Sequence, residues 1–152
     1  MATVLVTSAG RRVALLRAFL RAVAEVGGGR VLAADAAGSA PALHEADGHY
    51  IVPRYDTADY LPALLEICRR EGVALLVPTI DPELPALAHA RDVFARVGVM
   101  LALSSPETVD VAFDKIATAV FFAREGIPAP RLLDLDEALA GANGFTNASS
   151  KP

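Results

Sequence analysis

Two adjacent arginines follow a short apolar run near the start of the chain. Residues 7–12 (TSAGRR) come after Val4–Val6 and precede apolar residues at helical spacing. Gly10 permits a tight turn, and the N-terminus of the following helix offers free N–H groups and the positive end of its dipole. Arginines beside that end suit carboxylate or phosphate oxygens. An ordinary strand-to-helix turn with solvated arginines fits the same spacing equally well. The residues that we expect to hold an anionic substrate group are Ser8, Gly10, Arg11 and Arg12.

Two carboxylates follow a second apolar run. Residues 73–77 are wholly apolar, and residues 78–84 (PTIDPEL) come next. Asp81 could cap a helix, with Pro82 as its first residue and Glu83 complementing its dipole. Such a cap stabilises a helix by about 1 kcal/mol, which would by itself explain the segment. The functional alternative is that Asp81 and Glu83 face the same substrate cleft as Gly10.

Lysine is rare in this chain, which has two lysines against twelve arginines. A lysine is a compact point charge that suits phosphate oxygens. Lys115 follows the segments SSPE (104–107) and Asp114, at the start of a helical stretch. The plain alternative for Lys115 is a solvated surface lysine. Lys151 is followed by Pro152 within a small, polar ending.

The hydrophobic pattern alternates between strands and helices. Short apolar runs predict strands at residues 4–6, 30–34, 50–52, 73–77 and 99–103. Helical spacing predicts helices at residues 13–23, 40–45, 60–68, 82–96, 106–112 and 114–125, with a last extended piece at 131–133. This order predicts an α/β fold, a Rossmann-like parallel sheet of about five strands with helices on both faces. Ligands bind beyond the carboxyl ends of such strands, so the three segments should gather there.

Composition narrows the range of functions. The chain has 152 residues, 53% hydrophobic, with a net charge of −4, which argues against a nucleic-acid binder. Cys68 is the only cysteine, so there is no internal disulfide, and His44, His49 and His89 have no metal-ligand spacing. No apolar run could span a bilayer, and residues 1–7 do not resemble a signal peptide. We therefore expect a cytoplasmic protein that binds neither nucleic acid nor membrane.

A dinucleotide-dependent enzyme is disfavoured by the first loop. The dinucleotide fingerprint needs three glycines, and residues 7–12 contain only Gly10. Asp35, at the end of the second predicted strand, occupies the position of the ribose-binding acid of that fold. Without the glycines, we interpret Asp35 as a turn residue.

The ordered set of short motifs resembles one family. The set comprises TSAGRR (7–12), Asp35, APAL with Ala46-Asp47 (40–47), PTIDPEL (78–84), SSPE (104–107), Asp114-Lys115 and GIPAP (126–130). In this order the motifs resemble the N-terminal, pre-ATP-grasp domain of ATP-grasp ligases, most closely the carbamoyl-phosphate-synthase-large-subunit-like group. The resemblance covers about residues 3–134. It departs from the family before Lys151, where small and polar residues 146–150 replace an apolar strand.

The resemblance implies a domain layout and an activity. Residues 1–134 would form the pre-ATP-grasp domain, with 114–134 as the junction toward an ATP-grasp domain and 135–152 as a linker or disordered tail. The chain would be the N-terminal module of a carboxylate–amine ligase that forms an acyl phosphate with ATP and Mg²⁺. It would help to form the acceptor-substrate site, and Lys115 and Lys151 would contact ATP, while this chain would supply no metal ligand.

The resemblance also implies partners. The ATP-grasp catalytic half would be supplied in cis or as a separate chain, and this chain would be inactive alone. The substrate would be a small-molecule carboxylate or amine, and a homodimer is left open. The alternative hypothesis is a stand-alone Rossmann-type module that binds a nucleotide or a small anion without catalysis.

Overall fold

The computed structural model describes residues 2–130, 132, 133, 136 and 139. The chain divides into two compact units, Met1–Asp110 and Val111–Pro152. The predicted junction at 114–134 falls in the second unit, and most of the predicted tail lies outside the described residues. The domain limits given above stay a prediction.

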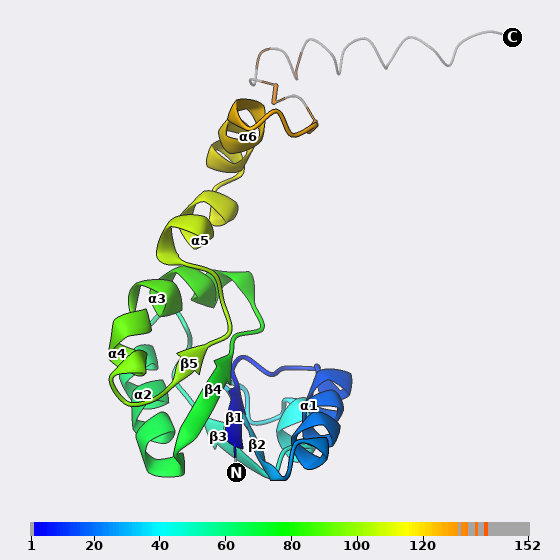
Figure 1. Ribbon diagram of the computed structural model, residues 1–152, viewed down its shortest axis with the longest axis vertical. Coiled ribbons are helices and arrows are strands. Elements are labelled where there is room, and N and C mark those ends of the chain that lie inside the picture. Colours follow the sequence, from blue (N-terminus) through cyan, green and yellow to red (C-terminus); the bar gives the residue numbers. More distant parts are fainter. Residues whose placement is uncertain (1, 131, 134–135, 137–138, 140–152) are drawn as a thin grey trace, which may run out of the picture. The chain divides into compact units, whose positions relative to one another are not determined.

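A five-stranded parallel sheet forms the centre of the first unit (Figure 1). Its strands are β1 (Ala2–Val6), β2 (Gly29–Asp35), β3 (Gly48–Ile51), β4 (Val73–Val77) and β5 (Met100–Leu101), in the order β3-β2-β1-β4-β5. All four pairings are parallel. The chain builds outward from β1 to β3 and then returns to place β4 on the other side of β1. Strand order therefore reverses between β1 and β4, where a doubly wound sheet offers its ligand crevice.

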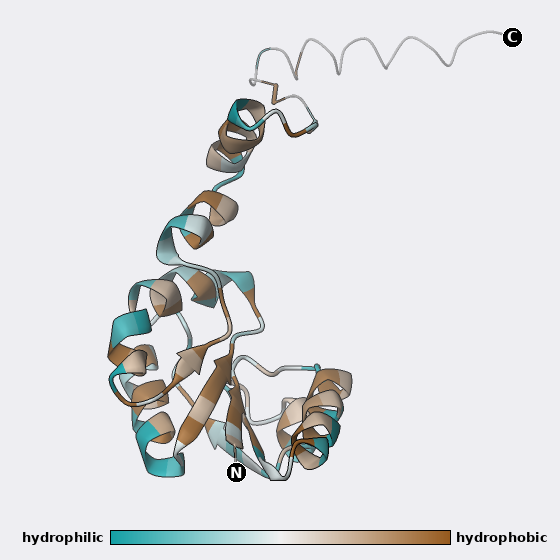
Figure 2. Ribbon diagram, viewed as in Figure 1, coloured by the Kyte–Doolittle hydropathy of each residue, from teal (hydrophilic) through white to brown (hydrophobic). Residues whose placement is uncertain are grey.

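Alternate side chains of the strands enter two separate cores. On one face, Val4 and Val31 pack with Leu16 of α1 (Val13–Glu25) and with η1 (Pro41–His44). On the other face, Leu5 and Leu32 pack under α2 (Tyr60–Glu71), α3 (Leu84–His89) and α4 (Arg91–Ala95). This period of two places helices on both faces (Figure 2), and each fully buried leucine stabilises the fold by about 1.5–3 kcal/mol. The predicted α/β, Rossmann-like fold is confirmed.

The predicted single helix over residues 82–96 is wrong. The segment forms a 3₁₀ turn, η2 (Asp81–Glu83), followed by α3 and α4. Pro85 has no N–H to donate to the carbonyl of Asp81, so a new helix begins at Leu84 with Pro85 in its first turn. Ala90 makes the second break, because its ψ of 2° lies outside the helical range.

Smaller differences concern helix caps and strand lengths. Ile80, rather than Asp81, is the N-cap of η2, and it makes no side-chain cap hydrogen bond. The predicted helix over 40–45 is the 3₁₀ turn η1. The fifth strand is assigned only to Met100–Leu101, although the N–H of Ala102 still bonds to the carbonyl of Leu76 at 2.8 Å. The hydrogen bonding between β5 and β4 thus continues one residue beyond Leu101.

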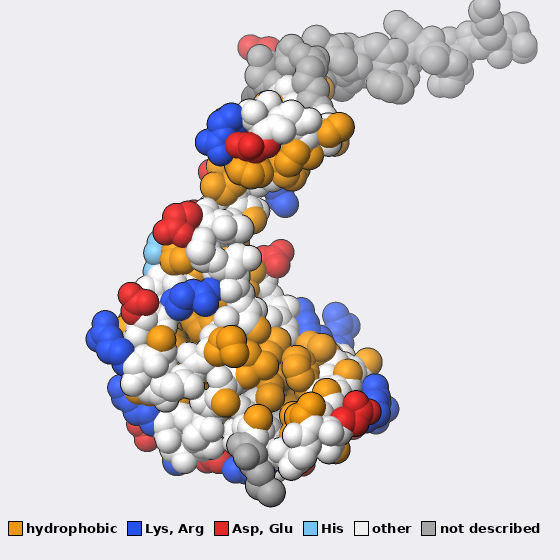
Figure 3. Space-filling view, in the orientation of Figure 1, with side chains coloured by type: hydrophobic (Ala, Val, Ile, Leu, Met, Phe, Trp, Pro, Cys, Tyr) orange, Lys and Arg blue, Asp and Glu red, His pale blue; other side chains and the backbone are white. Residues whose placement is uncertain are grey.

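The second unit contains the helix α6 (Lys115–Arg124), after α5 (Pro106–Phe113). Asp114 caps α6, because its carboxylate accepts the N–H groups of Ile116 (2.8 Å) and Ala117 (3.0 Å). None of the residues of α6 is buried, and hydrophobic side chains gather on its surface (Figure 3). Across the described part of the chain, every helix is too short or too polar to cross a membrane.

The structure leaves no room for a side chain at Gly29. A Cβ atom there would lie 2.1 Å from the carbonyl oxygen of Ala2 and 2.8 Å from Cγ1 of Val23. Relief requires β1 and β2 to separate, so Gly29→Ala should lower the free energy of unfolding by about 3 kcal/mol. Urea unfolding measures it. Gly38→Ala is the control, because its Cβ would meet Ile51 at an ordinary 3.5 Å. Equal stability of the two variants would contradict this account of the β1–β2 contact.

Candidate functional site

A cavity of about 270 Å³ opens at the carboxyl edge of the sheet in the first unit. Its walls come from the loops that follow β1, β2, β3 and β4, with the first residue of α2 completing them. The lining residues are Ser8, Gly10, Arg12, Asp35, Ala36, Val52, Pro53, Arg54, Tyr55, Tyr60 and Ile80. Because all the strands are parallel, their carboxyl ends converge at this edge, as the sequence predicts.

Asp35 shapes the turn that forms the floor of this cavity. Its carboxylate accepts the N–H of Gly10 at 2.7 Å and the N–H of Ala37 at 2.8 Å, one on each oxygen. Gly10 has a φ of 51°, in the left-handed region that favours glycine. Asp35 is therefore a turn residue, in agreement with the interpretation from the sequence.

Arg12 brings positive charge to the cavity beside the start of α1. Its Nη1 donates to the carbonyl of Ser8 at 3.3 Å, which leaves further guanidinium donors for other groups. The N-terminus of α1 has no side-chain cap hydrogen bond. Uncapped N–H groups and a nearby guanidinium are the groups that bind an anion at a helix N-terminus. Arg11 is exposed and does not line the cavity.

Glu83 lies buried beneath Ser8, with 0% of its surface exposed. Its Oε1 accepts the N–H groups of Thr79 (2.8 Å) and Ile80 (3.2 Å). Its Oε2 accepts the hydroxyl of Ser8 at 3.1 Å and the hydroxyl of Tyr60. A buried carboxylate is stable only when its oxygens are hydrogen-bonded, and four neutral donors meet that need here.

The backbone of Ser8 is strained and held from several sides. Ser8 has a φ of 48°, a left-handed conformation that costs a non-glycine residue about 1–2 kcal/mol. The hydroxyl of Thr79 lies 2.8 Å from the carbonyl oxygen of Thr7 and 2.7 Å from that of Ser8. Together with the bond from Ser8 to Glu83, these contacts join the loops after β1 and β4. They do so at the point where the strand order reverses.

Tyr60 is a hydrogen-bond donor throughout the ordinary pH range. Burial, reinforced by the neighbouring charge of Glu83 and the hydrogen bond to it, raises the pKa of the Tyr60 hydroxyl well above its usual value of 10.0. The phenol therefore keeps its proton and donates it to Glu83. Its side chain is 2% exposed and still contributes to the cavity wall.

The structure brings some of the predicted site residues together and separates others. Ser8, Gly10 and Arg12 line one cavity, and Glu83 lies behind Ser8. Asp81 is exposed and outside the lining, as Arg11 is. Lys115 is the exposed first residue of α6 in the second unit, and Lys151 lies outside the described residues. Substrate binding and ATP binding by these residues stay predictions.

Sequence reasoning missed the wall formed by the loop after β3 and by Tyr60. Pro53 ends the predicted third strand, so the parallel arrangement already implied that Arg54 and Tyr55 lie at the same edge. The end of the third predicted strand at Pro53 could therefore have identified Arg54 and Tyr55 as wall residues. Arg54 forms a two-pronged contact with Asp56, at 3.2 and 3.0 Å. Tyr60 gave no such signal, because its helical spacing predicts a core residue.

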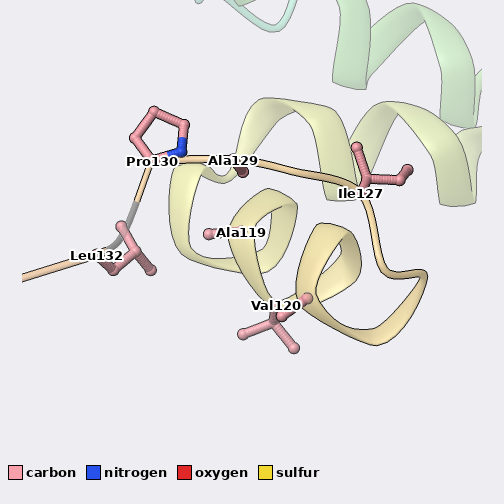
Figure 4. A pocket seen from close by; sticks show the side chains of 7 residues that line it. Ala119, Val120, Ile127, Ala129, Pro130 and Leu132 are labelled. Atoms are coloured by element: carbon pink, nitrogen blue, oxygen red, sulfur yellow. The ribbon is translucent and has the colours of Figure 1, made fainter.

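A second hollow, of about 430 Å³, lies in the second unit (Figure 4). It is formed by α6 and the segment after it, and its lining residues are Ala119, Val120, Ala123, Ile127, Ala129, Pro130 and Leu132. All seven side chains are apolar, so this hollow offers no side-chain acid, base or hydrogen-bond donor. The chemistry-bearing groups are those of the first unit's cavity.

The sequence matches the model of a known domain family. The family is described as the PylC-like N-terminal domain, and the match covers residues 4–102. The chain belongs to this family. The matched residues include the last three residues of β1, the other four strands and every residue that lines the cavity of the first unit. A comparison with curated protein sequences finds no match.

Solved structures share the fold of this PylC-like domain. The biotin carboxylase domain of a single-chain bacterial carboxylase aligns with a TM-score of 0.63 and 24% identity, covering 97% of this chain and 35% of that one. N5-carboxyaminoimidazole ribonucleotide synthetase from Thermotoga maritima aligns with a TM-score of 0.62 and 17% identity, covering 93% and 36%. The resemblance to N-terminal domains of ATP-grasp enzymes is confirmed, while the carbamoyl-phosphate-synthase-like group stays a prediction.

A third solved structure contains ligands. The biotin carboxylase domain dimer of 2-oxoglutarate carboxylase from Hydrogenobacter thermophilus, in complex with MgADP, ADP and bicarbonate, aligns with a TM-score of 0.61 and 21% identity. The alignment covers 93% of this chain and 32% of that one. The PylC-like chain thus spans about a third of the length of these three proteins. In its described residues, no group of three or more His, Cys, Asp or Glu side chains could hold a metal ion.

Tyr60→Phe should weaken the contact between the two loops. Loss of one donor to a buried carboxylate should lower the free energy of unfolding by about 1–3 kcal/mol at pH 7. Because the folded-state pKa of Tyr60 is raised above 10.0, its contribution is full below pH 10 and falls as the pH rises above 10. Urea unfolding should therefore show a smaller difference in unfolding free energy between wild type and variant above pH 10 than at pH 7. A gap that widens with pH would contradict the assignment of Tyr60 as the donor.

Proposed function

We propose that this chain is the N-terminal module of an ATP-grasp carboxylate–amine ligase and helps to form its acceptor-substrate site. The substrate is a small-molecule carboxylate or amine. The catalytic half is supplied in cis or as a separate chain, and the 152-residue chain is inactive alone. Membership of the PylC-like N-terminal domain family and a fold common to ATP-grasp enzymes support this proposal.

The observation that carries the proposal is the cavity beside the start of α1. We call Ser8, Gly10 and Arg12, which line it, the anion seat. A carboxylate there would meet the guanidinium of Arg12 and the uncapped N-terminal turn of α1. The cavity volume of about 270 Å³ lies near the lower end of the roughly 300–1,000 Å³ range of small-molecule sites. A cavity of this size suits a small metabolite.

The other predicted substrate-binding residues take indirect roles in this proposal. Arg11 is exposed next to the anion seat and adds positive charge that attracts an anion. Asp81 is exposed at the start of η2 and would meet a substrate that extends out of the cavity. Glu83 acts from beneath, through its hydrogen bond with Ser8.

ATP and Mg²⁺ are the cofactors of the proposed ligase. Lys115, exposed at the N-terminus of α6, would hold phosphate oxygens of ATP, and Lys151 is the second predicted contact. ATP would activate a carboxylate as an acyl phosphate. The described residues do not fit Mg²⁺, because none of their carboxylates cluster as ligands, so the catalytic half would have to hold the ion.

Arg12→Gln should weaken the binding of small anions to the anion seat. Acetate added to the ¹⁵N-labelled chain should shift the amide resonances of Gly10 and Arg11, and the variant should bind acetate about tenfold more weakly, because a charge-assisted hydrogen bond is lost. Arg17→Gln is the matched control, since Arg17 lies in α1, one turn after Arg12, and pairs with Glu45 at 2.8 Å. If acetate leaves these resonances unchanged in the wild type, the proposed acceptor site is wrong.

Mg-ATP should bind poorly to the isolated chain. Lys115 is a single surface cation, and the described residues provide no magnesium ligands, so isothermal titration calorimetry should detect little heat. Addition of an ATP-grasp catalytic half should restore binding, and Lys115→Ala should weaken that restored binding. Tight binding of Mg-ATP by the chain alone would favour the stand-alone nucleotide-binding module instead.

A further inference from the structure

We infer that Glu83 fixes the hydroxyl of Ser8 as a hydrogen-bond acceptor, so that the anion seat selects a small anion carrying its own N–H or O–H donor. This inference rests on the proposed function and names the substrate class of the same site. It depends on the direction of the hydrogen bonds behind the cavity wall rather than on the presence of charge alone. Two hydroxyl groups, those of Ser8 and Tyr60, determine that direction.

The direction of the Ser8 bond follows from what Glu83 can do. A carboxylate accepts hydrogen bonds and has no proton to donate. The contact of 3.1 Å between Ser8 Oγ and Glu83 Oε2 therefore uses the single hydroxyl proton of Ser8. What Ser8 Oγ retains is lone-pair capacity, and Ser8 is one of the residues that line the cavity. A ligand that approaches this oxygen finds an acceptor.

Tyr60 reinforces the same polarity. Its hydroxyl donates to the same Oε2 atom of Glu83, so its proton also points into the protein rather than toward the ligand. The side chain of Tyr60 lines the cavity as well. Both hydroxyl groups at this wall thus direct their protons to one buried carboxylate. Neither hydroxyl proton is therefore left for a ligand.

Arg12 supplies the opposite polarity in the same cavity. Its guanidinium donates to the backbone carbonyl of Ser8 at 3.3 Å. This bond keeps the guanidinium close to the residue that carries the acceptor hydroxyl. The anionic group of a ligand belongs with Arg12, and a donor group belongs with Ser8. A simple carboxylate satisfies only the first, whereas a hydroxy acid or an amino-substituted acid satisfies both.

Glu83 cannot be replaced by its amide without a change of polarity. Glutamine has one acceptor oxygen and an NH₂ group that only donates. Four donors converge on the two oxygens of Glu83, so glutamine would oppose N–H to at least one of them. When that N–H faces Ser8, the hydroxyl proton of Ser8 is released toward the cavity. Glu83 is therefore a positioning residue, and its effect is seen in selectivity.

Three probes of similar size separate polarity from charge. Acetate has no donor, glycolate carries a hydroxyl donor, and methoxyacetate carries an ether oxygen without a donor. All three are fully ionised at pH 7. Amide shifts of Gly10 and Arg11 give their dissociation constants. The wild type should bind glycolate about tenfold more tightly than acetate or methoxyacetate, the effect of one hydrogen bond in a partly closed site.

Two variants test the role of the network, with one matched control. Ser8→Ala should bind acetate and remove the preference for glycolate, and Glu83→Gln should reduce that preference. Glu71→Gln is the control, because Glu71 also accepts a tyrosine hydroxyl, that of Tyr50 at 2.6 Å, but does not line the cavity. It should keep the wild-type preference. If Glu83→Gln does not fold, Ser8→Ala decides alone, since it leaves Tyr60 bonded to Glu83.

The outcomes separate this inference from the proposed function. If the wild type binds acetate at the anion seat and binds glycolate no more tightly, the inference is overturned and the acceptor site stands. An unchanged preference in Ser8→Ala overturns it as well. If no anion perturbs Gly10 or Arg11, the acceptor site itself is wrong and the inference falls with it.

Discussion

The carboxylate of Glu83 is the group on which the functional edge of the sheet depends. It is fully buried, and each unpaired donor or acceptor in such a place costs several kcal/mol. Its four partners are two backbone N–H groups and two hydroxyls, so the negative charge is stabilised without a cation. Two of these partners come from the segment after β4, one from the loop after β1 and one from α2. A single carboxylate thus determines how three parts of the chain meet.

This meeting point coincides with the reversal of strand order between β1 and β4. In doubly wound sheets the loops diverge there and leave a crevice. In this protein Thr79 and Glu83 bond to the loop after β1, and the cavity is lined by residues from the loops after β1, β2, β3 and β4. The left-handed backbone of Ser8 is consistent with these contacts between the loops, because backbone strain persists only where surrounding contacts hold it. The Glu83 and Thr79 contacts are those that hold it here.

The solved structures that resemble this chain share its fold, which does not by itself specify a function. Identities of 17 and 24% accompany TM-scores of 0.62 and 0.63, because many different sequences can supply the apolar strands of a parallel sheet. Function lies in the loops at the carboxyl edge, which the fold places but does not specify. The PylC-like N-terminal domain family covers those loops in this chain. For that reason the polarity of the cavity wall is more informative about the ligand than the architecture is.

The sequence by itself determined the elements and their order. Short apolar runs predicted the strands, helical spacing predicted the helices between them, and Gly10 alone predicted the tight turn after the first strand. It failed at residues 82–96, where Pro85 and Ala90 break a helix that the apolar pattern alone had favoured. Glu83 looked like a first-turn acid complementing a helix dipole. Only the tertiary structure made it a buried acceptor, because its partners Ser8 and Tyr60 lie 75 and 23 residues away in the chain. The spacing of residues along the chain does not reveal these long-range contacts, because they form only when the carboxyl ends of the parallel strands converge.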